Sequence, residues 1–71
     1  MLDYAIIDGT KIKNGDWVGF KSDTEQYGKV VEIKRGRYST ILVLENEYGF
    51  DGDYIGGDTR TTMNADECWV D

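Results

Sequence analysis

The chain of 71 residues contains no proline and no histidine, and it has a single cysteine, Cys68. One cysteine forms no internal disulfide, and without histidine it is too few ligands for a structural zinc site. The absence of histidine also excludes the usual Ser-His and Cys-His nucleophile pairs. Because the sequence carries no cofactor motif either, we expect a protein that is not an enzyme and that holds no metal and no cofactor.

Cys68 itself gives no reason to expect chemistry. It follows Asp66 and Glu67 in the sequence, and neighbouring carboxylates disfavour a reactive thiolate. We therefore predict a small thiol packed in the core.

The chain is also short of hydrophobic sequence. A domain of this size buries only about 60% of the surface of its unfolded chain, so we expect one domain spanning 1–71 with a thin core. Nine aromatic residues enlarge that core, and self-association would add to it.

No apolar run approaches the roughly 20 residues of a membrane span. The first residues include Asp3 and no basic residue, so we expect no signal peptide and a cytoplasmic location.

Basic residues are scarce in the second half of the chain. Residues 1–44 hold seven Lys/Arg and six Asp/Glu, whereas residues 45–71 hold one Lys/Arg and eight Asp/Glu, and the net charge is −6. This acidic half disfavours direct binding to nucleic acid or to an anionic membrane. It favours a protein partner, including a basic protein that itself binds nucleic acid.

Short runs of β-branched and aromatic residues, bounded by Gly, Asn or Asp, predict an all-β protein. We expect strands near 4–7, 17–21, 27–34, 38–45, 60–63 and 68–70. Alternation within the second of these strands puts Val18 and Phe20 on one face and Trp17 on the other. The polar insert 22–26 is expected to be a loop, and residues 64–67 one helical or 3₁₀ turn capped by Asn64.

Two further features of these strands give expectations. Residues 34–37 are predicted to form a hairpin tip in which Gly36 supplies a positive φ. The continuous apolar run 41–44 predicts a strand covered on both faces, with the outer cover supplied by the N-terminal segment, a long loop or another subunit. Trp69 is expected to be mostly buried at the seam of the sheet.

Three stretches resemble the KOW and Tudor branches of the SH3-like superfamily. They are Gly15-Asp16-x-Val18-x-Phe20, Tyr27-Gly28-Lys29-Val30-x-x-Ile33 and the ending Asn64-Ala65-Asp66-Glu67-Cys68-Trp69-Val70. The resemblance implies a small five-stranded SH3-like barrel with one 3₁₀ turn before the last strand. It also implies binding, since members of these branches bind RNA, ribosomal components, RNA polymerase, methylated side chains or other proteins.

Residues 46–58 form a long Gly-rich segment in which acids alternate with aromatic side chains. Exposed aromatics surrounded by charge are common at protein interfaces. The leading interpretation is a module that engages a protein partner through an aromatic and acidic surface. Its expected residues are Trp17, Tyr48, Phe50, Tyr54, Asp51, Asp53 and Asp58. Trp17 lies on this surface unless the N-terminal segment covers it.

Other interpretations remain open. The eight acids of residues 45–71 would let the chain mimic nucleic acid and inhibit a host protein, as short acidic proteins of phages and mobile elements do. The basic tip, with Lys34, Arg35 and Arg37, would contact phosphate in an RNA or ribosome-binding protein of the KOW type, with Lys21 and Lys29 nearby. Residues 51–58 have a spacing similar to a calcium loop, but Ile55 and Thr62 stand where oxygen ligands are needed.

Overall fold

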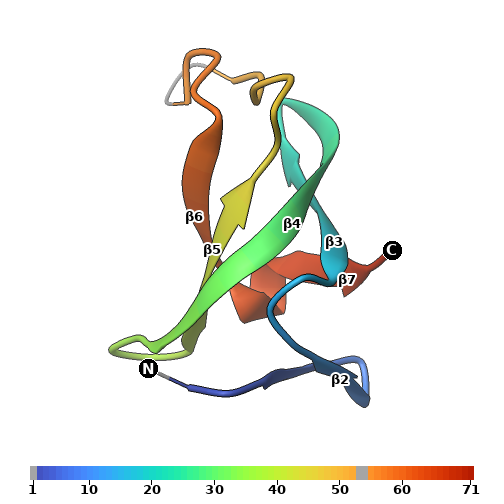
Figure 1. Ribbon diagram of the computed structural model, residues 1–71, viewed down its shortest axis with the longest axis vertical. Helices are drawn as coiled ribbons and strands as arrows, with labels where there is room; N and C mark the ends of the chain where they lie inside the picture. The colour runs from blue at the N-terminus through green and yellow to red at the C-terminus, as the bar shows by residue number, and fades with distance from the viewer. Residues whose placement is uncertain (1, 53–54) are drawn as a thin grey trace.

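The computed structural model describes residues 2–52 and 55–71 (Figure 1). The elements are β1 (Ala5–Ile7), β2 (Thr10–Ile12), β3 (Trp17–Ser22), β4 (Thr24–Arg35), β5 (Thr40–Glu45), β6 (Arg60–Asn64), the 3₁₀ turn η1 (Ala65–Glu67) and β7 (Cys68–Val70). No helix in the described ranges is long and apolar enough to cross a membrane.

The main feature of this all-β fold is a five-stranded antiparallel sheet. Its strand order is β6-β5-β4-β3-β7, so β6 and β7 form its two edges. The long, curved strand β4 runs through the middle of the sheet, and η1 lies below it (Figure 1). The prediction of an all-β chain with a 3₁₀ turn before the last strand is confirmed.

A separate hairpin, β1 with β2, precedes the sheet. Its strands pair from Ala5↔Ile12 to Ile7↔Thr10, which leaves Asp8 and Gly9 as a two-residue turn. Both turn residues have positive φ, 50° and 77°, as a tight Asp-Gly hairpin turn requires. The sequence predicted the first strand but not β2, in which only Ile12 is buried.

The expectation of a loop over residues 22–26 is wrong. Strand pairing continues as far as Ser22↔Thr24, so only Asp23, with a φ of 65°, makes the turn between β3 and β4. The polar residues of this stretch belong to the strands because their backbone groups are paired across a tight hairpin. Polarity alone therefore did not distinguish an exposed strand end from a loop.

The core lies on one face of the sheet. Val18 and Phe20 are both fully buried on it, as strand alternation predicted. In β4, Val30 and Ile33 are both fully buried although three positions separate them. A register shift between Val30 and Glu32 inserts one extra residue, and this β-bulge turns both side chains inward.

Strand β5 is covered on both faces along most of its length. Leu42 and Leu44 belong to the core, and Val43, on the other face, is only 2% exposed. The guanidinium of Arg60 on β6 lies 3.2 Å from Glu45 and 3.9 Å from Glu32 on β4. Since β5 lies between β6 and β4, the Arg60 side chain must cross β5 beside Val43. The outer cover thus comes from neighbouring strands of the same sheet.

The chain ends with η1 and β7. Asn64 stands at the N-terminal cap of η1, as predicted, but its side chain makes no capping hydrogen bond. Its Nδ2 instead donates to Glu67 Oε1 at 2.8 Å. Cys68, the first residue of β7, is buried in the core, which confirms the predicted environment of the thiol.

Candidate functional site

A row of four side chains crosses the outer face of the sheet. Strand register places Trp17 opposite Lys29, Lys29 opposite Glu45, and Glu45 opposite Arg60. Directly opposed residues on one face have Cβ atoms about 5 Å apart, so this row is continuous. It brings an aromatic ring and alternating charges together from β3, β4, β5 and β6.

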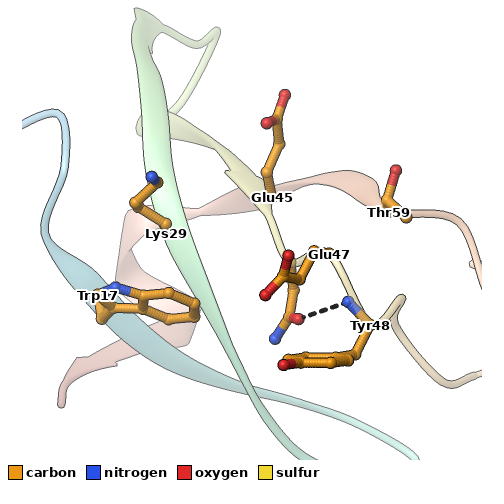
Figure 2. Close-up of a pocket in the computed structure, with 7 residues that line it drawn as sticks. Trp17, Lys29, Glu45, Glu47, Tyr48 and Thr59 are labelled. Atoms are coloured by element: carbon orange, nitrogen blue, oxygen red, sulfur yellow. Dashed lines mark hydrogen bonds between the residues drawn. The ribbon is translucent and has the colours of Figure 1, made fainter.

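A groove of about 610 Å³ lies along this row. It is lined by Trp17, Lys29, Glu45, Asn46, Glu47, Tyr48 and Thr59. Figure 2 shows the indole of Trp17 and the ring of Tyr48 on opposite sides of the groove, with Glu47 between them. The Trp17 side chain is 43% exposed and that of Tyr48 is 89% exposed, so both offer ring surface to a ligand.

Asn46 fixes the segment that carries Tyr48. Its Nδ2 donates to the carbonyl of Tyr27 at 3.0 Å, which ties the segment to β4. Its Oδ1 accepts from the backbone N–H of Tyr48 at 2.9 Å, and its own N–H donates to the carbonyl of Thr59 at 3.0 Å. These bonds hold the backbone of Tyr48 at the groove, although the ring itself is free to adjust.

The expectation that Phe50 lies on the binding surface is wrong. Its ring is 1% exposed and packs against Phe20 with centroids 5.5 Å apart. Its backbone N–H donates to the carbonyl of Asp58, and its carbonyl accepts from Gly57, both at 2.9 Å. Phe50 is therefore a core anchor that holds the segment after β5 against the sheet.

Two other expected residues of this segment, Asp51 and Asp58, do not line the groove. Both residues are exposed. Tyr54 and Asp53 lie outside the described residues. Of the predicted partner-binding residues that the structure describes, Trp17 and Tyr48 are thus the two that line one groove.

The outer face carries a second pair of aromatic side chains beside Trp17. Trp69 on β7 pairs with Gly19, and a Cβ at Gly19 would overlap the indole, so the indole lies over the glycine. Gly19 is in turn opposite Tyr27, which is 41% exposed. Trp69 keeps only a minor part of its surface in contact with solvent, which agrees with the expectation of a mostly buried residue. A glycine inside an otherwise regular strand is the sequence signal for such a close approach.

The hairpin between β4 and β5 carries an exposed basic tip, which consists of Lys34, Arg35 and Arg37. Gly36 does not have the expected positive φ. It is required instead by space, since a Cβ there would overlap the carbonyl of Ser39, which accepts the Gly36 N–H at 2.9 Å.

The lysines expected near the basic tip are not there. Lys29 lines the groove, and Lys21 pairs with Glu25 beside the turn at the far end of β3. The tip is therefore a compact cluster of three basic side chains.

The acidic residues of the second half that lie in the described ranges fall into two groups. Glu45, Glu47, Asp51 and Asp58 belong to the end of β5 and the segment that follows it, at the top of Figure 1. Asp66 and Glu67 lie in η1, and the chain ends close by, on the other side of the molecule (Figure 1). In the part of the chain that the structure describes, no group of three or more Asp, Glu, Cys or His side chains is placed to hold a metal ion.

The thiol of Cys68 is less acidic than an ordinary cysteine thiol. Burial, reinforced by the charges of Glu67 and Asp66, raises the pKa of its thiol from 9.0 to about 11. The Sγ atom lies 3.5 Å from the carbonyl of Asn64, to which the thiol donates. The thiol is thus protonated at neutral pH.

The chain matches no model of a known protein family, no curated protein and no solved structure.

Proposed function

We propose that the sheet of this protein is an SH3-like barrel. Three observations support the proposal: the strand order β6-β5-β4-β3-β7, the 3₁₀ turn placed directly before the last strand, and the bulged twelve-residue strand β4. A long strand that bends at a bulge is able to belong to both layers of a small barrel. Phe50 fills the end of the core next to Gly28, where a Cβ would lie 3.1 Å from the ring.

On this fold, the function is non-enzymatic binding of a protein partner through the groove between Trp17 and Tyr48. One observation carries the proposal: two exposed aromatic rings from distant parts of the chain stand on facing sides of one groove. Trp and Tyr are the side chains that most often dominate the binding energy of protein interfaces. On binding, each side chain removes a large apolar area from water, and only two side-chain torsions lose their freedom.

The two sides of the groove carry opposite charges. Lys29 lies on the Trp17 side, whereas Glu47 lies beside Tyr48 (Figure 2). Two carboxylates line the groove. Glu45 is engaged by Arg60 at 3.2 Å, whereas Glu47 makes no ion pair with any of residues 2–52 and 55–71. A partner segment gains most by placing a positive group on the Tyr48 side of the groove.

Protein binding at the groove has more support than the two alternative functions, mimicry of nucleic acid and binding of RNA. A nucleic-acid mimic needs a continuous row of acids, but the second-half acids that the structure describes divide between two ends of the molecule. An RNA reader would use the basic tip, where three basic side chains are not reinforced by Lys21 or Lys29. Neither alternative makes use of Trp17 or Tyr48.

The proposal is tested by capture of partners from a host lysate with the tagged full chain and with Trp17→Ala and Tyr48→Ala. Partners of the groove are retained by the parent protein, with or without nuclease, and lost from both variants. Tyr4→Ala, which removes an exposed ring elsewhere, serves as the matched control and should retain them. Capture that survives both groove variants but is displaced by competing DNA would instead support the mimic.

A further inference from the structure

We propose that the partner bound at the groove is a second copy of this chain, which inserts its basic tip between Trp17 and Tyr48. This inference rests on the proposed function, because it uses the same groove. In this contact the basic tip, defined by Lys34, Arg35 and Arg37, meets the carboxylates of Glu47 and Glu45 of the next molecule. The chain then associates head to tail.

Charge complementarity identifies the tip as the occupant. Residues 33–44 hold three basic residues and no acid, whereas residues 45–58 hold five acids and no basic residue. These two segments follow each other in sequence but occupy opposite ends of the β4–β5 hairpin (Figure 1). Each molecule thus presents a positive end and a negative end, and opposite ends of two molecules attract one another.

A tip is unable to reach the groove of its own molecule. Thr40 pairs with Arg35 at the tip, and Glu45 pairs with Lys29 at the groove. Five residues of extended strand separate the two positions along β5, a distance of about 17 Å. Because β4 and β5 are hydrogen-bonded throughout, the tip does not fold back, and its charges are satisfied by solvent or by another molecule.

The backbone and one arginine side chain of the tip are conformationally restrained. The N–H of Gly36 donates to the carbonyl of Ser39 at 2.9 Å, which closes the turn. The guanidinium carbon of Arg37 lies 5.6 Å from the centre of the Tyr38 ring, and that ring is 91% exposed. An arginine already stacked on an aromatic ring loses less conformational entropy on binding.

The groove offers matching chemistry. The faces of Trp17 and Tyr48 attract a guanidinium through their negative π-electron surfaces, and Glu47 supplies a full negative charge. Lys29 repels a cation from the Trp17 side. The arginine of the incoming tip is therefore placed near Tyr48 and Glu47, and the neighbouring Tyr38 is left to pack toward Trp17.

The symmetry of this contact follows from its two unlike surfaces. Tip and groove are different parts of the molecule, so the contact is heterologous, and each bound copy leaves one free tip and one free groove. Unless the rotation closes into a ring, the chain forms open oligomers that lengthen with concentration. A symmetric dimer is not expected.

The test is sedimentation velocity of the full chain over a range of concentrations, at low salt and at about 1 M salt, where charges are screened beyond about 3 Å. The parent protein should form concentration-dependent oligomers at low salt that dissociate at high salt. The double variant Arg35→Glu, Arg37→Glu and the single variant Glu47→Lys should each associate about tenfold more weakly or not at all. Lys13→Glu and Asp66→Lys, charge reversals at exposed positions elsewhere, are the matched controls and should associate as the parent does.

Mixing the two reversed variants gives the decisive result. The first then has an acidic tip and an acidic groove, and the second has a basic tip and a basic groove. Each repels itself, whereas the mixture should regain association. A monomeric parent protein, or a mixture that associates no better than its components, would overturn the inference. If that occurs while lysate partners still depend on Trp17 and Tyr48, the proposed function stands with a different partner.

Discussion

The side-chain amide of Gln26 binds both backbone groups of Asp51. Its Oε1 accepts the Asp51 N–H at 2.7 Å, and its Nε2 donates to the Asp51 carbonyl at 2.8 Å and to the carbonyl of Ser22 at 3.0 Å. One side chain on β4 thus substitutes for a neighbouring strand and holds the segment between β5 and β6. That segment carries Tyr48 to the groove and Phe50 to the core.

Replacing Gln26 with Ala should loosen this segment. Loss of the hydrogen bonds should lower the free energy of unfolding by about 1–3 kcal/mol, measured by urea denaturation. Hydrogen exchange should accelerate at the amides of Asp51 and Gly57 more than in β3. Glu25→Ala, the neighbouring exposed position, should change neither quantity. Equal acceleration across the whole sheet would show that Gln26 does not act locally.

Phe50 and Tyr48, two aromatic residues of one segment, should respond oppositely to truncation. Phe50→Ala leaves a cavity beside Phe20 and should cost about 3–5 kcal/mol of folding free energy. Tyr48→Ala removes an exposed ring and should change stability by no more than about 0.5 kcal/mol while abolishing partner capture. Thermal unfolding of the two variants checks this contrast, and similar stability losses would contradict the assigned roles.

Gly19→Ala should displace the indole of Trp69. The added Cβ overlaps the ring, so we expect a loss of about 1–3 kcal/mol and a red-shifted tryptophan emission. Trp17 also emits, so the measurement is made in a Trp17→Phe background. In a Trp69→Ala background the same glycine substitution should cost much less, because the clash is gone. An unchanged cost would place the strain elsewhere.

Stability should fall in alkaline solution because of Cys68. Its pKa is about 11 in the folded protein and 9.0 when unperturbed, so the folded state retains the proton more strongly. As the pH rises from 9 toward 11, the unfolded chain ionises first, and the stability associated with the neutral thiol is lost. The Cys68→Ala variant should not show this alkaline loss of stability. Urea unfolding of the parent and the variant across this pH range measures the difference in their free energies of unfolding. A difference independent of pH would contradict the raised pKa.

The same thiol should react slowly with alkylating reagents. At about pH 8 the folded protein should be modified far more slowly than the protein in urea, since the thiolate is the nucleophile. Mass spectrometry of timed samples gives both rates. Comparable rates would show that Cys68 is not protected in the folded state.

Some of these features were accessible from the sequence. Alternation in β3 predicted that Val18 and Phe20 point inward and Trp17 outward, because side-chain direction in a strand depends only on the position along it. The acidic turn before β7 and the position of the basic hairpin tip were predicted for the same reason: they depend on neighbouring residues. The end of the strand pairing near Asp23 was wrongly predicted, since polar residues are common both in loops and at strand ends.

The rest was decided by tertiary structure. Acids and aromatic residues alternate in residues 46–58 without assigning a face to each ring, so nothing in the sequence indicated that Phe50 enters the core while Tyr48 stays outside. The cover of Val43 depends on Arg60 reaching across β5, and the place of Trp69 depends on a glycine in another strand. The groove itself joins β3 to the segment after β5. The sequence by itself determined where most of the strands lie and how side chains alternate between their faces, because those properties are local. Strand register decided which of those faces meet, because pairing is a property of the assembled sheet.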